Sequence, residues 1–145
     1  MAALAVLAAL TAPAGAGWRV VGPGMAVGEA RAGGASIAAE CHGDGMVLGV
    51  YEKDWVFDHE APLTLLVDDN AFTVRQYGSG DRILLADGTN GSGQLDLSPK
   101  LRKALRSGSE IRLDGPNVGH FETREITFSL LGSRKAIETV ERFCE

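Results

Sequence analysis

The sequence predicts a mainly β, α+β fold: an antiparallel β-sandwich or a partly open barrel of seven to eight strands, with two short helices, the second at the C-terminus. Through most of residues 17–145, apolar side chains recur at every second position, which is the period of half-buried strands. Gly, Asn, Asp and Pro separate these segments and favour turns. With 145 residues, 45% of them hydrophobic, the chain has room for one domain with a substantial core.

Residues 1–16 are typical of a secretory signal peptide. They carry no charged side chain and are dense in Ala, Leu and Val, and the composition changes abruptly at Gly17. The small residues Ala14-Gly-Ala16 precede a cleavage expected before Gly17, with Ala14 as an earlier alternative. The usual Lys/Arg-rich start is missing, and the competing interpretation is a buried helix, although the run is too short to span a bilayer. We therefore expect a signal peptide at 1–16 and a single β-rich domain at 17–145.

The strand segments follow in order along the mature chain. Strand patterning is found at 18–21, 35–41, 46–51, 64–67, 71–77, 82–86, 93–97, 110–114 and 121–130. The Gly-rich segment 22–34 is expected to be a loop. Alternation within 35–41 places Cys41 on the core side. Turn-forming residues at 42–45 and 68–70 predict that the strands on either side of each form hairpins.

Two amphipathic helices interrupt the strand pattern. The first starts after Ser98, a good N-cap, has Pro99 at its first position, and stops at Gly108. The second begins near Ser133. Its apolar side is predicted to comprise Ala136, Ile137, Val140, Phe143 and Cys144. Cys144 is therefore expected to face inward.

The two cysteines, Cys41 and Cys144, most simply form one disulfide if the protein is exported to an oxidising compartment. Two free buried thiols or a metal pair are the alternatives. A zinc site favours closely spaced ligands, whereas these two positions are far apart with no local partner cysteine. In the chain-entropy model, a disulfide that closes so long a loop stabilises the fold by about 4 kcal/mol. It would tie the C-terminal helix to the body of the domain.

The charge distribution bears on partners. A net charge of -5, from 19 acidic and 14 basic residues, disfavours nucleic acid as a partner. The mature chain contains no segment long and apolar enough to cross a membrane. The first helix has a basic outer face, which could dock an acidic partner, an anionic lipid head group or an envelope polysaccharide; the alternative is a solvated helix face. The candidate binding residues are Lys100, Arg102, Lys103 and Arg106.

Candidate metal ligands occur in one stretch, where Asp54, Asp58, His59 and Glu60 lie close in sequence. Their spacing matches neither a calcium loop nor a histidine-based zinc motif, and the alternative is an exposed acidic connection. No Gly-x-Ser-x-Gly elbow or phosphate-binding loop is present. We predict no catalytic residues and no cofactor.

The order of elements resembles the invasion-associated locus B family of bacterial envelope proteins. The resemblance rests on the opening Trp18-Arg-Val-Val21, a cysteine in an early strand, and an ending with Phe128-Ser-Leu-Leu-Gly132, Ala136, a helix and Cys144. It implies a periplasmic or secreted β-rich protein, associated in some bacteria with entry into host cells and without established catalytic residues.

These observations together predict a noncatalytic exported envelope protein. It would act by binding another envelope or secreted macromolecule. The alternatives are a small-ligand or metal-binding periplasmic module with 54–60 at its mouth, and an exported hydrolase. The sequence carries no signal for an oligomeric state.

Overall fold

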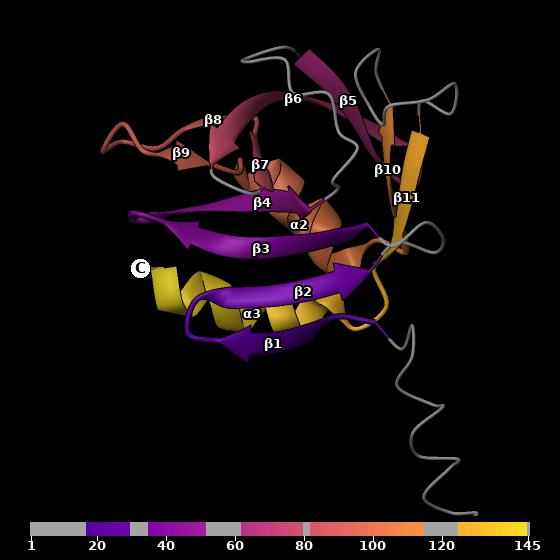
Figure 1. Cartoon of the computed structure of the whole chain (residues 1–145), viewed down its shortest axis with the longest axis horizontal. Coiled ribbons are helices and arrows are strands. Elements are labelled where there is room, and N and C mark those ends of the chain that lie inside the picture. Colours follow the sequence, from indigo (N-terminus) through magenta and orange to yellow (C-terminus); the bar gives the residue numbers. More distant parts are fainter. Residues whose placement is uncertain (1–16, 30–34, 52–61, 80–81, 115–124, 145) are drawn as a thin grey trace, which may run out of the picture.

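The computed structural model of the chain describes residues 17–29, 35–51, 62–79, 82–114 and 125–144. In these ranges the protein is mainly β, with one large antiparallel sheet and two helices (Figure 1). The signal peptide expected at 1–16 lies outside the described residues and stays a prediction. No helix in the described ranges is long and apolar enough to cross a membrane.

The large sheet has nine strands in these ranges. They are β1 (Arg19–Gly22), β2 (Met25–Glu29), β3 (Ser36–His42), β4 (Gly45–Tyr51), β5 (Pro62–Val67), β6 (Asn70–Ser79), β7 (Arg82–Ala86), β10 (Glu110–Asp114) and β11 (Glu125–Ser129). A second, two-stranded sheet pairs β8 (Gly88–Thr89) with β9 (Leu95–Asp96). The helices are α2 (Pro99–Ser107) and α3 (Ser133–Cys144). The predicted fold class, with its second helix at the C-terminus, is confirmed.

The strands of the large sheet follow the order β1-β2-β3-β4-β7-β6-β5-β10-β11, and all neighbours are antiparallel. In the described part of the chain, β1 and β11 are therefore the two ends of the sheet. Helix α3 packs across β1, β2, β3 and β4, and α2 lies beside α3 (Figure 1). The apolar core fills the space between the sheet and these helices.

Trp18 joins the two ends of the sheet. Its indole Nε1–H donates a hydrogen bond of 2.8 Å to the Ser129 carbonyl at the end of β11, and its backbone N–H donates one of 2.8 Å to the Leu131 carbonyl. On the other side it lies against β2, where a Cβ at Gly28 would be only 2.5 Å from Nε1. The ring is buried. Position 28 therefore requires glycine, because the Trp18 indole lies too close to the backbone there for any side chain.

Burial along the strands follows the alternation in the sequence. In β5 the side chains of Leu63, Leu65 and Val67 are buried, and the residues at 62 and 64 are exposed. Strand β4 is instead buried on both faces, because Val47 joins a small second apolar cluster on the face opposite the main core. This burial fixes the register of each strand, because a slip of one residue would move its buried side chains to the opposite face.

The expected loop at 22–34 is wrong for residues 25–29, which form β2 between β1 and β3. The glycines there suggested a loop, but two of them have a local role. Gly24 adopts φ +68 in the turn before β2, and Gly28 accommodates Trp18. With β2 added, the large sheet has more strands than the seven to eight expected.

Two further expectations need correction. The strand expected at 93–97 is reduced to Leu95–Asp96, because the Asn90 side-chain carbonyl accepts from the Ser92 and Gln94 amides and folds the preceding residues into a turn. Phe143, expected on the apolar side of the second helix, is 60% exposed. At about 100° per residue, a helix that centres Val140 and Cys144 on the core turns Phe143 outward.

Truncating Trp18 should destabilise the fold more than truncating a neighbouring exposed residue. We expect Trp18→Ala to lower the free energy of unfolding by about 3–5 kcal/mol, because it leaves a cavity where β2 meets β11. Val20→Ala, at a side chain that is 46% exposed, is the control and should cost less than about 1 kcal/mol. Urea denaturation of the mature protein measures both; equal losses would contradict this role for Trp18.

Candidate functional site

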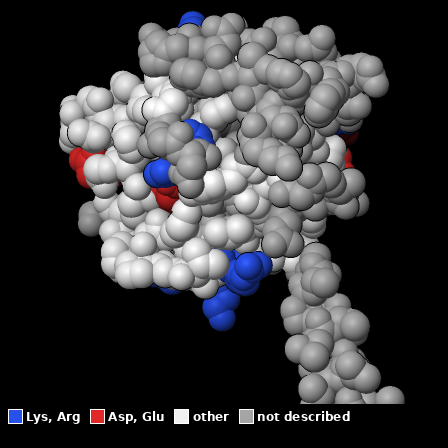
Figure 2. Space-filling view, in the orientation of Figure 1, with Lys and Arg blue, Asp and Glu red and all other residues white. Residues whose placement is uncertain are grey.

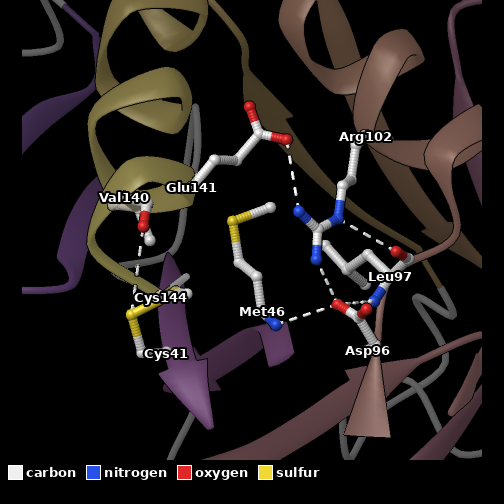
Figure 3. Close-up of a disulfide and its surroundings, with 8 residues drawn as sticks. All are labelled: Cys41, Met46, Asp96, Leu97, Arg102, Val140, Glu141 and Cys144. Carbon is white, nitrogen blue, oxygen red and sulfur yellow. Dashed lines mark hydrogen bonds and ion pairs between the residues drawn. A yellow bond between two sulfur atoms is a disulfide. The ribbon is translucent and has the colours of Figure 1, made fainter. Parts of the chain in front are cut away.

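A disulfide between Cys41 and Cys144 ties β3 to the last turn of α3 (Figure 3). The two residues are 103 positions apart in sequence, and their Cα atoms lie 5.2 Å apart. Gly24 is required beside the bond, because a Cβ there would lie 2.8 Å from the Cys41 sulfur. The predicted pairing is confirmed, and it fixes the C-terminal end of α3 to the sheet.

The start of α3 is fixed to α2 by Ser133. Its hydroxyl donates a 2.7 Å hydrogen bond to the Leu105 carbonyl, and its backbone N–H donates to the Leu130 carbonyl at 2.9 Å. The Ser133 side chain is buried, so this bond is shielded from water. Both ends of α3 are thus anchored, one to the neighbouring helix and one to the sheet.

An ion-pair network at the α2–α3 contact involves two of the four predicted binding residues. The Arg102 guanidinium pairs with Asp96 and with Glu141, and its Nε–H donates to the Leu97 carbonyl at 3.0 Å (Figure 3). Arg106 pairs with the same Glu141 oxygen at 2.7 Å. The Glu141 carboxylate is only 17% exposed. These two arginines therefore hold the helices together.

The Asp96 carboxylate extends this network into the sheet. One of its oxygens accepts from the Met46 amide at 2.9 Å and from its own neighbour, the Leu97 amide, at 3.0 Å. Arg102 shares the same oxygen. The Asp96 carboxylate and the Arg102 guanidinium consequently join four elements: the start of β4, the β8–β9 hairpin, α2 and α3.

The other two predicted binding residues, Lys100 and Lys103, point away from this contact. They line a hollow of about 340 Å³ together with residues at the start of β6, among them Phe72. Both lysines are exposed. The basic helix face expected from the sequence is therefore divided between an interhelical contact and a small surface hollow.

A larger groove lies between the end of α2, the turn after β11 and the outer face of α3. Its volume is about 820 Å³. Four basic side chains and one acidic side chain line it, together with an exposed leucine of the turn: Arg106, Arg134, Lys135, Arg142, Glu138 and Leu131. Of these, only Arg106 was predicted as a binding residue, because the other cations come from the second helix.

The cations of α3 are weakly neutralised within the groove. Arg134 and Glu138 form a 3.8 Å ion pair between exposed side chains, which is worth less than about 1 kcal/mol. Arg142 donates to the Thr139 hydroxyl at 3.5 Å, a neutral acceptor. The first turn of α3 carries no acidic residue, although anions are favoured at the positive end of a helix. The sequence signal that was missed is this Arg134-Lys135 pair at a helix start.

Charges on the opposite face are arranged differently. Figure 2 shows the side that faces away from α3, where the described Lys and Arg side chains lie in separate small groups, one of them beside acidic side chains. Apolar and uncharged residues cover most of the described surface in this view. No continuous basic surface is seen there among the described residues.

A buried acid that the sequence did not predict as a site lies on β3. Glu40 is 5% exposed, and its carboxylate accepts from Arg82 at 2.6 and 2.8 Å and from the Tyr51 hydroxyl at 3.3 Å. Gly49 makes room for it, because a Cβ there would lie 2.2 Å from the carboxylate. Glu40 is thus paired and hydrogen-bonded, as a buried charge in a stable fold must be.

The predicted metal ligands Asp54, Asp58, His59 and Glu60 lie outside the described residues. Within the ranges that are described, no group of three or more His, Cys, Asp or Glu side chains could hold a metal ion. The metal site at 54–60 stays a prediction.

Comparison with known proteins identifies no relative. No protein-family model matches the chain, and neither the curated proteins nor the solved structures include a significant match. The resemblance to the invasion-associated locus B family therefore stays a prediction based on the residues quoted for it.

Replacing both cysteines by serine should destabilise the domain without leaving a free thiol. Because the bond closes a loop between positions 103 apart, the chain-entropy model predicts a loss of about 4–5 kcal/mol. Urea denaturation of the oxidised protein and of the Cys41→Ser/Cys144→Ser variant measures this loss. The same midpoint for both, or two free thiols in the intact mass of exported protein, would contradict the assigned role.

Glu141→Gln tests the interhelical network. It leaves two arginines without their shared carboxylate, so we expect the free energy of unfolding to fall by about 1–3 kcal/mol. Glu138→Gln, which removes the same charge from an exposed pair on the same helix, should change it by less than about 1 kcal/mol. Chemical denaturation compares the two variants; a larger loss for Glu138→Gln would contradict the network.

Proposed function

We propose that the protein is a noncatalytic envelope protein, exported to the periplasm or secreted, that acts by binding another macromolecule. The observation that carries this proposal is the groove of about 820 Å³ beside α3, lined by cations from two helices on a chain with a net charge of -5. A local excess of one charge in a concave surface attracts ligands of the opposite charge.

Export is supported by two independent features. A disulfide joins Cys41 to Cys144, and such bonds form and persist in oxidising compartments. The composition of residues 1–16 is typical of a secretory leader, with cleavage expected before Gly17. The resemblance to an envelope protein family agrees with the same location.

A binding role is supported by how the groove is held. Its walls belong to regular elements, α2 and α3, which are joined by the Arg106–Glu141 ion pair and the Ser133–Leu105 hydrogen bond. Sites on anchored helices lose less conformational entropy on binding than sites on loops do. The hollow at Lys100 and Lys103 has less than half the volume of the groove and lies outside the proposed binding site.

Affinity capture tests this proposal. The tagged mature protein is crosslinked in its native envelope, and the captured material is identified by mass spectrometry, with an unrelated exported protein carrying the same tag as the control. We expect a macromolecular partner at close to stoichiometric amount, absent from the control. An empty capture would contradict macromolecular binding and favour a small ligand, for which a groove of this volume is also large enough.

A further inference from the structure

We propose that the groove beside α3 binds an acidic segment of a protein, in which Asp or Glu side chains flank an apolar residue. The site consists of Arg134, Lys135 and Arg142, which contact the carboxylates, and Leu131, which contacts the apolar residue. Arg106 also lines the groove, but it is paired with Glu141. This inference rests on the proposed function, because it names the chemistry of the partner that the protein would bind.

The charges of the groove fit carboxylates. Two of its cations that are not engaged between the helices, Arg134 and Arg142, are arginines, whose planar guanidinium groups bind carboxylates in a bidentate manner. The acid that lines the groove, Glu138, is held 3.8 Å from Arg134 in a loose, exposed pair. A carboxylate of the partner can therefore replace Glu138 at Arg134 without disrupting the core.

Leu131 selects a protein segment over other polyanions. It is 62% exposed, in the turn between β11 and α3, and lies in the groove next to the cations. A sulfated or carboxylated polysaccharide offers anionic groups but no apolar side chain to cover this leucine. A flat anionic membrane surface fits a concave groove poorly. An acidic peptide with one apolar side chain supplies both contacts.

The turn that presents Leu131 is fixed by the backbone. The Leu131 carbonyl accepts a hydrogen bond of 2.8 Å from the Trp18 amide. The Leu131 amide donates one of 3.1 Å to the Ser129 hydroxyl. Gly132 follows with φ +78, a conformation that glycine adopts without strain. The backbone that carries the exposed side chain is consequently held in place, as expected of a preorganised contact.

Peptide binding to the mature, oxidised protein tests the inference. The probe is a fluorescein-labelled peptide of alternating Glu and Leu, compared by fluorescence anisotropy with a peptide in which Gln replaces Glu. Arg134→Gln/Lys135→Gln should weaken binding of the acidic peptide roughly tenfold, because two ionic contacts are lost. Lys100→Gln/Lys103→Gln makes the same change of charge at the smaller hollow and should weaken it by less than about twofold. Leu131→Ser should weaken binding of the Glu-Leu peptide but leave binding of a Glu-Gly peptide unchanged.

Three outcomes would overturn the inference. The first is no binding of the acidic peptide, and the second is an equal loss in both double variants. The third is preferential binding of dextran sulfate, or of vesicles of phosphatidylglycerol and phosphatidylethanolamine, with loss in the Arg134→Gln/Lys135→Gln variant. The affinity capture from the envelope distinguishes failure of this inference from failure of the proposed function. A partner that is captured equally by the Arg134→Gln/Lys135→Gln variant leaves macromolecular binding intact and removes only the groove as its site.

Discussion

The position of α3 against the sheet is the constraint on which the rest of the structure depends. This helix covers four strands of one half of the sheet, and it is attached at each end by a different kind of bond. The disulfide closes a loop with a sequence separation of 103, so it removes far more freedom from the unfolded chain than any local contact can. At the other end, the turn before α3 is tied to Trp18, which also bridges the two ends of the sheet. The N-terminal and C-terminal segments of the domain thus stabilise each other.

Once α3 is fixed, the charges on α2 and α3 acquire distinct roles. Residues at the contact between the helices, Arg102, Arg106 and Glu141, neutralise one another. Among the described residues, the basic side chains on the outer face of α3 have only weak or neutral partners, which leaves the groove positive. A protein that is acidic overall can in this way present a local site for anions, since fields between exposed charges are screened beyond about 10 Å at moderate ionic strength. One side of the helix therefore contributes to stability, and the other side carries the groove that we propose as the binding site.

The sequence was sufficient for the features that depend on local patterns. Ser98 accepts from the Leu101 amide as the predicted N-cap of α2, and the alternation of 35–41 placed Cys41 where it meets Cys144. The sequence was insufficient where the reason for a residue is its contact with another residue that is far away in sequence. Gly24 and Gly28 suggested a loop, but they accommodate Cys41 and Trp18 in three dimensions. The groove was missed for the same reason, since Arg106 and Arg134 meet only after the two helices have packed.

The central claim is that the groove beside α3 is where this protein meets its partner. Backbone amide chemical-shift mapping tests it most directly, with the ¹⁵N-labelled mature, oxidised protein titrated with the Glu-Leu peptide. The account predicts that the largest, saturable shifts fall in 106–109 and 130–142, the segments that form the groove. Shifts centred instead on β1, on β3 near Glu40, or around Lys100 and Lys103 would contradict it.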